Sequence, residues 1–336
     1  MEIRVSVIGA GSWGTTVAAL ACRNAPTLLW ARRPELAEQI NRDHENCDYL
    51  PGFPLPHSLR ATADLEEAVN HADLLVMGVP SLGFRDALEA VKPYLRPWVP
   101  VISLAKGLEV GTRLRMSEVI AEVLPGRPIG VLTGPNLAKE ILAGHAAATV
   151  IAMDDDNVAR AVQGIFQGDL FRVYLNEDIV GCELGGVLKN VVAIAAGMAE
   201  GLGAGDNTRA AVITRGLSEM SRLGIGLGGQ PLTFSGLAGM GDLVATCMSH
   251  QSRNRHVGHR LGEGQTIDEI TTAMNMVAEG VKTSKVVMEL AREHGITMPI
   301  AAEVEAVCHQ GRTAAEAYAG LLPRGQREMD GLTPAR

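Results

Sequence analysis

The chain has 336 residues, more than one typical domain holds, so its length predicts two domains. Hydrophobic residues make up 46% and charged residues 20%, values typical of a globular protein with a substantial core. A formal net charge of −8 and an aromatic content of 4% argue against a nucleic-acid-binding protein, which needs a basic surface and stacking side chains. An anionic ligand must therefore be held by a local set of donors.

The start of the chain and its cysteines predict a cytoplasmic protein. The first residues, 1–4, lead directly into an apolar run and lack the pattern of a secretory signal. The most apolar later stretch, residues 191–199, is too short to span a bilayer, so we expect no membrane insertion. The five cysteines are scattered and form no C-x-x-C pair: Cys22, Cys47, Cys182, Cys247 and Cys308. Such an odd set is typical of free thiols in a reducing compartment.

In the first half of the chain, short apolar runs alternate with helical patterns. The runs that predict buried strands are residues 3–8, 27–30, 74–79, 99–104, 129–132 and 147–152. The helical patterns between them include residues 15–23, 35–43 and 114–123. This alternation predicts an α/β domain over residues 1–180, with a Rossmann-like, doubly wound and mostly parallel sheet.

The second half has a different texture from about Asp178 onward. Strand-like runs disappear, and long helical stretches rich in Ala, Leu, Gly and Met follow at residues 180–202, 210–223, 266–275 and 283–294. We therefore expect an all-helical domain over residues 181–322. The polar tail, residues 323–336, is expected to be poorly ordered.

Gly9, Gly11 and Gly14 form the pattern G-x-G-x-x-G directly after a predicted strand and before a predicted helix. The first glycine of this pattern makes a tight turn, the second lets the backbone approach a pyrophosphate, and the third lets the helix pack on the strand. The N–H groups of the helix N-terminus then bind the phosphates. The first domain is therefore predicted to bind a nicotinamide dinucleotide.

The second predicted strand is followed by Arg32 and Arg33. An acidic residue that would bind the ribose 2′-hydroxyl of NAD is absent about 20 residues after the turn, whereas arginines accept a 2′-phosphate. The pair favours NADP over NAD. The alternative is that the two arginines are solvated side chains at a strand end with no role in cofactor binding.

Lys189 lies within an apolar helix rich in small residues, and Asp242 opens a later one. A buried ammonium needs a partner, and a buried lysine can exchange a proton with a hydroxyl or carbonyl oxygen. From these residues alone, Lys189 is either a general acid–base or a side chain whose stem merely packs. Asp242 is either a helix N-cap or the partner that orients Lys189.

Further polar residues gather in segments 249–256, 106–109 and 134–140. The first holds donors of the kind that bind a phosphate. The other two follow predicted strands, where open α/β sheets bind ligands. The histidines near Cys247 follow no familiar zinc spacing and stand beside two arginines, so we expect no metal site.

Taken together, these segments resemble the bacterial-type NAD(P)-dependent glycerol-3-phosphate dehydrogenases over residues 3–311. The pieces follow the family's order at residues 9–14, 44–51, 106–109, 134–140, 188–191, 214–220, 236–246, 252–255 and 279–280. The resemblance implies reversible, NAD(P)H-dependent reduction of dihydroxyacetone phosphate to sn-glycerol 3-phosphate for phospholipid synthesis. It also implies a homodimer.

The resemblance also implies roles for individual residues. Those implied to contact the cofactor, besides the three glycines, are Ser12, Trp13, Arg32, Arg33, Tyr49, Lys106, Ala138, Arg253, Val277 and Glu279. Those implied to hold substrate are Lys106, Gly134, Asn136, Lys189, Asp242, Ser252, Arg253 and Asn254. Lys189 matches the family's proton acceptor, with Asp242 and Thr246 as its catalytic neighbours.

Two positions depart from the family's commonest pattern. Asn136 stands where Ser or Thr is usual, although its amide can still donate to a phosphate, and Ala278 stands where Val is frequent.

Beside the function that the resemblance implies, the residues leave two other functions open. One is a two-domain dehydrogenase of the β-hydroxyacid or ketopantoate reductase type, and the other is a non-catalytic dinucleotide-binding redox sensor.

Overall fold

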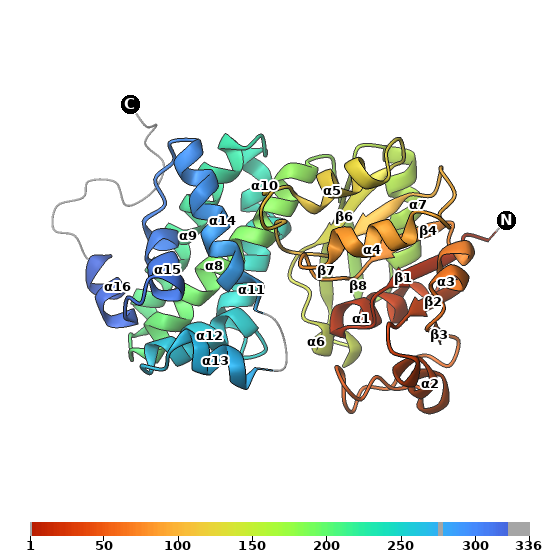
Figure 1. Ribbon diagram of the computed structural model, residues 1–336, viewed down its shortest axis with the longest axis horizontal. Coiled ribbons are helices and arrows are strands. Elements are labelled where there is room, and N and C mark those ends of the chain that lie inside the picture. Colours follow the sequence, from red (N-terminus) through yellow and green to blue (C-terminus); the bar gives the residue numbers. More distant parts are fainter. Residues whose placement is uncertain (1, 275–277, 322–336) are drawn as a thin grey trace. The chain divides into compact units, whose positions relative to one another are not determined.

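The computed structural model describes residues 2–274 and 278–321 (Figure 1). It divides into two compact units, the first made of Met1–Glu109 and Leu114–Ile179, the second of Val110–Arg113 and Val180–Arg336. The expected domain boundary after residue 180 falls beside this division. The expected tail at residues 323–336, like Val277, lies outside the described residues.

The first unit is built on one eight-stranded sheet with the order β3-β2-β1-β4-β5-β6-β7-β8. Its strands are β1 (Val5–Ile8), β2 (Thr27–Trp30), β3 (Arg60–Thr62), β4 (Leu74–Met77), β5 (Val101–Ser103), β6 (Ile129–Thr133), β7 (Ala147–Met153) and β8 (Phe171–Asn176). All neighbouring pairs are parallel except β6 and β7. The order reverses at β1, the point at which this type of sheet binds dinucleotides. The predicted Rossmann-like fold is confirmed.

Two strands were not predicted, and each has a physical reason. β3 is only three residues long, too short to show a pattern. β8 is an edge strand in which buried and exposed residues alternate around Arg172 and Tyr174, so it lacks a continuous apolar run.

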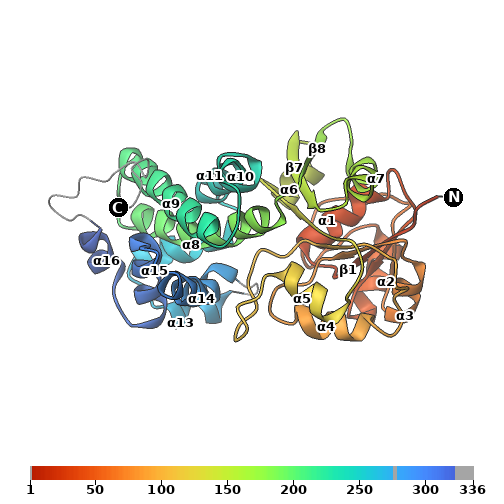
Figure 2. The same ribbon diagram turned by 90° about the horizontal axis from the view of Figure 1, so that it is seen from above.

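Helices cover both faces of the sheet (Figure 2). One apolar core lies between the sheet and α1, α2 and α7, and the other between the sheet and α3, α4 and α5. The helices are α1 (Ser12–Ala21), α2 (Pro34–Asp43), α3 (Leu65–His71), α4 (Phe84–Val91), α5 (Met116–Val123), α6 (Ala138–Leu142) and α7 (Asp156–Phe166). These two cores hold the carboxyl ends of β1, β2, β5 and β6 in place.

The described part of the second unit is helical, as predicted. It contains α8 (Ile179–Gly201), α9 (Asp206–Gly226), α10 (Pro231–Ser235), a π-helix η1 (Leu237–Gly241), α11 (Asp242–Met248), α12 (Arg253–Gly262), α13 (Ile267–Ala273), α14 (Glu279–Glu293), α15 (Pro299–His309) and α16 (Ala314–Gly320). Every residue of α8 from Gly181 to Ala199 is buried, so α8 forms the centre of the unit.

Helix α8 corrects one expectation about its length. The apolar stretch 191–199 belongs to a helix of 23 residues with a mean hydropathy of 1.6, long and apolar enough by itself to cross a membrane. However, 89% of its most apolar window is buried inside the unit. The packing of α8 is therefore that of a core helix, and its burial, not its length, supports the expectation of no membrane insertion.

Helices α8 and α12 cross at two pairs of glycines four residues apart. A Cβ atom at Gly197 would lie 2.1 Å from the carbonyl oxygen of Arg255, and one at Gly258 would lie 2.0 Å from that of Ile194. Gly201 and Gly262 meet one turn further along, where a Cβ on either would come within 2.9 Å of the other's Cα. The backbones therefore touch, which fixes the middle and the end of α12 against α8.

Candidate active site

The three glycines of the turn after β1 are each required for a different reason. Gly9 has a φ of +115°, and a Cβ there would lie 2.9 Å from the carbonyl oxygen of Gly78. A Cβ on Gly14 would lie 2.0 Å from the oxygen of Gly9, so only glycine lets α1 pack on the turn. A Cβ on Gly11 would meet nothing within 4 Å. Gly11 therefore faces open space, as close approach of a pyrophosphate requires.

The N-terminus of α1 offers N–H groups to an anion. Gly11 occupies the N-cap position, and within residues 2–274 and 278–321 no side chain caps this end. The first turn of α1 also carries no acidic residue. Unpaired N–H groups and the positive end of the helix dipole favour a phosphate at this place. The turn and α1 therefore fit the diphosphate of a dinucleotide.

Two residues implied to contact the cofactor, Ser12 and Tyr49, are brought together beside this turn. The Ser12 hydroxyl donates to the backbone oxygen of Tyr49 at 3.1 Å. Trp13 lies in the first turn of α1, and its buried Nε1 has no hydrogen-bond partner among the described residues. The segment after α2 thus lies against the start of α1.

Arg32 and Arg33 lie one residue beyond the end of β2, and both are exposed. Arg33 forms an ion pair with Asp48, so one of the two guanidinium groups already has a protein partner. Both side chains lie in solvent, so a guanidinium could bind a 2′-phosphate there without either charge being buried. The structure thus favours Arg32 over Arg33 as the readily available cation.

The segments after β5 and β6 are tied to each other. The Lys106 ammonium donates to the backbone oxygen of Gly134 at 2.9 Å. The Asn136 amide donates to the Thr149 hydroxyl on β7 at 2.9 Å, which orients this side chain by contacts inside the sheet. Its Oδ1 is buried without a hydrogen-bond partner among the described residues. Ala138 begins the short helix α6.

In the second unit, Lys189 lies at a buried polar cluster. Its ammonium is 2.6 Å from Asp242 Oδ1 and 2.7 Å from the Thr246 hydroxyl. The exposed fraction is only 6% for Lys189 and 2% for Asp242. Two adjacent turns of α11 thus hold the ammonium of α8 at one point in an apolar surrounding.

The approach of α11 to Lys189 depends on a glycine one turn earlier in α8. A Cβ at Gly185 would lie 2.5 Å from the backbone oxygen of Ala238 in η1, so the π-helix packs directly on α8. Because η1 runs straight into α11, Asp242 has helical neighbours on both sides. The N-cap interpretation of Asp242 is therefore wrong, and its carboxylate instead meets the ammonium of Lys189.

The Cys247 thiol beside this cluster stays protonated. Burial raises the pKa of Cys247 to about 12, an effect opposed in part by the charge of Lys189. A neutral thiol is a poor nucleophile, so this cysteine is not poised for covalent chemistry.

The three residues implied to hold a phosphate at α12 differ in the contacts that they make within the protein. The Ser252 hydroxyl caps α12 by accepting from the Arg255 N–H at 3.2 Å. Asn254 donates to Asn190 Oδ1 at 2.9 Å and accepts from the Gly280 N–H at 3.0 Å, so it joins α8, α12 and α14. Arg253 is exposed at the start of α12. Ser252 and Asn254 are thus also structural, which the sequence did not reveal.

Glu279 begins α14 and is half-buried, next to the glycine that Asn254 holds. Asn190 and Asn46 were not assigned roles from the sequence, yet both are buried and bonded to other candidate residues or to the glycine turn. What marks both residues is the burial of a polar amide in an apolar environment, and burial cannot be read from a single sequence.

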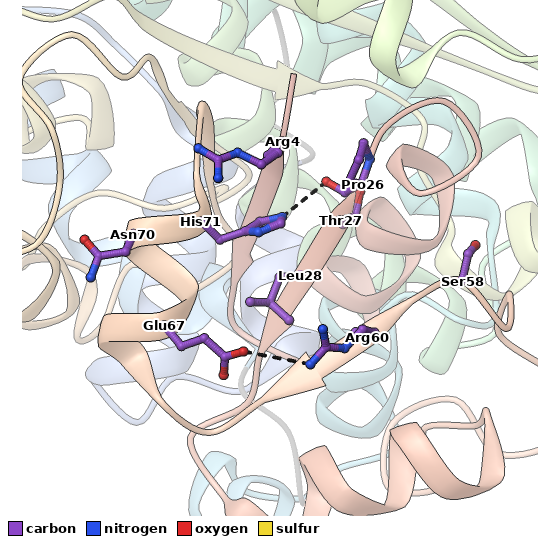
Figure 3. Close-up of a pocket in the computed structure, with 9 residues that line it drawn as sticks. All are labelled: Arg4, Pro26, Thr27, Leu28, Ser58, Arg60, Glu67, Asn70 and His71. Carbon is purple, nitrogen blue, oxygen red and sulfur yellow. Dashed lines mark hydrogen bonds and ion pairs between the residues drawn. The ribbon is translucent and has the colours of Figure 1, made fainter. Parts of the chain in front are cut away.

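The first unit also has a hollow whose lining includes none of these residues (Figure 3). It is lined by Arg4, Thr27 and Arg60, among others, at the amino ends of β1, β2 and β3. The glycine turn follows the opposite, carboxyl end of β1. Arg4 pairs with Asp73 at 3.0 Å and Arg60 approaches Glu67 at 3.9 Å, so the hollow's charges are already compensated.

The described residues contain no group of three His, Cys, Asp or Glu side chains placed to hold a metal ion.

Comparisons with known proteins give a consistent result. The family model for the NAD-dependent glycerol-3-phosphate dehydrogenase N-terminus matches residues 4–159, and the model for the C-terminus matches residues 178–319. An NAD(P)+ glycerol-3-phosphate dehydrogenase of Sphingopyxis alaskensis is 61% identical over 96% of this chain and 97% of its own. One of Mycobacterium avium is 56% identical over 96% of this chain and 94% of its own. The crystal structure of glycerol-3-phosphate dehydrogenase from Coxiella burnetii matches with a TM-score of 0.92 and 37% identity, covering 96% of this chain and 99% of that one.

Proposed function

The chain belongs to the family of NAD-dependent glycerol-3-phosphate dehydrogenases, and we propose that it reduces dihydroxyacetone phosphate to sn-glycerol 3-phosphate, reversibly, with NAD(P)H. The observation that carries this proposal is the buried ammonium of Lys189 between Asp242 and Thr246. Such an ammonium can give a proton to the oxygen of a ketone and take it back from the alcohol.

Residues of the first unit are proposed to bind the cofactor. The N–H groups at the start of α1 hold the diphosphate, with Gly11 leaving room for it, and Arg32 binds a 2′-phosphate. When bound, the nicotinamide supplies the hydride that becomes the new C–H bond. We assign Ser12, Trp13, Tyr49 and Ala138 to cofactor contacts, and Lys106, Gly134 and Asn136 to substrate.

In the second unit, Lys189 is proposed as the proton donor to the C2 oxygen. Asp242 keeps the ammonium charged and aimed, and Thr246 fixes it from a second side. An ammonium already in place stabilises the negative charge that develops on that oxygen. Arg253 is proposed to bind the substrate phosphate, with Ser252 and Asn254 beside it, so that this remote contact positions C2. Glu279 is assigned to the cofactor.

The test is an assay of the purified chain. Oxidation of NADPH and of NADH is followed by absorbance in separate assays with dihydroxyacetone phosphate, with ketopantoate and with a β-keto acid as the substrate. We expect turnover with dihydroxyacetone phosphate alone, and faster turnover with NADPH because of Arg32. No oxidation with dihydroxyacetone phosphate would contradict the proposal, and turnover with ketopantoate instead would assign the chain another reaction.

We further propose that the chain acts in the cytoplasm as a homodimer and that its product supplies the glycerol backbone of phospholipids. The free cysteines support the first point, since the structure contains no disulfide among the five.

A further inference from the structure

We propose that Asn46 is a positioning residue for dinucleotide binding, because its amide fixes the glycine turn with the N–H groups of the turn facing the pyrophosphate. Asn46 lies between α2 and β3 and is fully buried. Its Nδ2 donates to the backbone oxygen of Ala10 at 3.0 Å and to the Thr15 hydroxyl at 2.9 Å. Both hydrogens of this amide nitrogen are therefore committed, one to the turn and one to α1.

The bond to Ala10 determines where the next N–H points. In a planar trans peptide, the carbonyl and the following N–H point in opposite directions, so holding the Ala10 oxygen also orients the Gly11 N–H. A carbonyl turned toward the pyrophosphate would repel it, whereas the N–H attracts it. The contact with Asn46 thus selects the orientation that suits an anion.

The turn needs such an anchor because a glycine follows Ala10. Rotation of the Ala10–Gly11 peptide changes ψ of Ala10 and φ of Gly11, and a Cβ on Gly11 would meet nothing within 4 Å, so sterics at Gly11 hold this peptide only weakly. The amide of Asn46 supplies the missing constraint.

The segment that carries Asn46 is itself held on both sides. The Leu50 N–H donates to the Asn46 oxygen at 2.7 Å, and the Leu55 N–H donates to the His44 oxygen at 2.7 Å. The Ser12 hydroxyl bonds to Tyr49 from the other side. These bonds leave Asn46 little freedom, so its amide is a fixed point of reference for the turn.

The amide oxygen of Asn46 indicates that the residue is needed for its donor nitrogen. Asn46 Oδ1 is buried and has no hydrogen-bond partner in the described part of the chain. An unpaired buried acceptor destabilises the fold, and an apolar side chain of the same size would avoid that cost. A role in packing alone therefore does not account for an amide at this position.

The test rests on the dinucleotide binding of the proposed function and uses the full chain with Asn46→Leu, which keeps the size of the side chain and removes the donor. We expect ADP-ribose and NADPH to bind about tenfold more weakly by calorimetric titration, the effect of one lost hydrogen bond. The kcat at saturating NADPH should change much less than the KM for NADPH. Loss of a purely structural contact would instead lower the midpoint of thermal unfolding without this split.

Asn41→Leu is the matched control. Asn41 on α2 donates to the Ala61 oxygen and accepts from the Ala61 N–H, both at 2.8 Å, and it touches neither the turn nor α1. We expect it to lower thermal stability while leaving ADP-ribose affinity unchanged. Equal losses of affinity in the two variants would overturn the proposal, as would wild-type affinity in Asn46→Leu.

Thr15→Val provides a second route if Asn46→Leu does not fold. It removes one of the two acceptors of the Asn46 amide and keeps the shape of the side chain. We expect ADP-ribose to bind about threefold more weakly, a fraction of one hydrogen bond; unchanged affinity would overturn the proposal. Failure of the wild-type chain to bind ADP-ribose would instead contradict the proposed function.

Discussion

At the scale of single residues, the pair of Lys189 and Asp242 shows how burial constrains a charged site. Both side chains are almost fully buried, with exposed fractions of 8% and 2%, so each charge helps to compensate the burial of the other. The Coulomb attraction and the hydrogen bonds to Thr246 offset the desolvation of both ions. Removal of one partner therefore affects both the chemistry and the fold.

Lys189→Met is expected to lower kcat by about 10³-fold or more, because the proton donor is lost. Stability should also fall by about 3–5 kcal/mol, since the buried Asp242 loses the positive charge that balances it. NADPH affinity should be retained, because the assigned cofactor contacts lie elsewhere. Turnover assays, urea unfolding and NADPH titration check the three parts.

The double variant Lys189→Met with Asp242→Asn separates these effects. It also removes the negative charge that Lys189 balanced, so we expect most of the lost stability to return while the chain stays inactive. Recovery of turnover together with stability would remove Lys189 from the mechanism.

At the scale of elements, the first turn of α15 is held by a carboxyl group from α9. Glu219 accepts from the N–H groups of Ile300 at 2.8 Å and Ala301 at 3.2 Å. Burial raises the pKa of Glu219 to about 7, although these hydrogen bonds oppose the shift. The second unit thus contains a carboxyl group that titrates near neutral pH.

The raised pKa predicts that this group stabilises the fold in acid. Between the ordinary value of 4.5 and about 7, the folded chain holds a proton that the unfolded chain has lost. The contribution is complete below pH 4.5 and is lost as the pH rises through 7; it amounts to about 3 kcal/mol. Urea unfolding from pH 5 to pH 8 should show this slope in the wild type and a flatter curve in Glu219→Gln. Parallel curves would contradict the assignment.

The glycine crossing of α8 and α12 makes a second prediction at this scale. Gly258→Ala should lower stability by about 1–3 kcal/mol, because its Cβ would overlap the backbone of α8 and push α12 away. Gly164→Ala is the matched control, since Gly164 lies in α7 with nothing within 4 Å of a Cβ. There the change should raise stability by about 0.5–1 kcal/mol through helix propensity. Thermal unfolding of the two variants should therefore move in opposite directions, and shifts of equal sign would contradict this account.

At the scale of the whole molecule, the chain consists of a sheet-based unit with the dinucleotide turn and a helical unit with the buried lysine. Each unit has its own core, so each set of candidate residues is held by packing within its own unit.

The proposed homodimer is tested at this scale by light scattering of the purified chain. We expect a mass twice that of one chain over the micromolar range, without a change on dilution. The mass of a single chain at all concentrations would contradict the dimer and leave the proposed reaction untouched.

Much of the first unit was predictable because its signals are local. Six of the strands follow from continuous apolar runs, and the dinucleotide turn follows from steric demands at three positions within six residues. β3 and β8 escaped prediction because one is short and the other is an edge strand with alternating exposure. In the second unit, helices such as α12 and α16 escaped prediction because small, polar and charged residues interrupt their apolar pattern.

By itself, the sequence determined the fold class, the glycine turn and the cation after β2, since each depends on residues close together in the chain. Only the tertiary structure decided between the two roles left open for Asp242, which meets Lys189 across 53 positions, and showed that Asn254 joins three helices and that Asn46 contacts the turn. The reason is physical: the partner of a buried polar group is chosen by which backbones can approach, and here glycines such as Gly185 allow that approach. No local pattern records such a choice, because it belongs to the packing of distant elements.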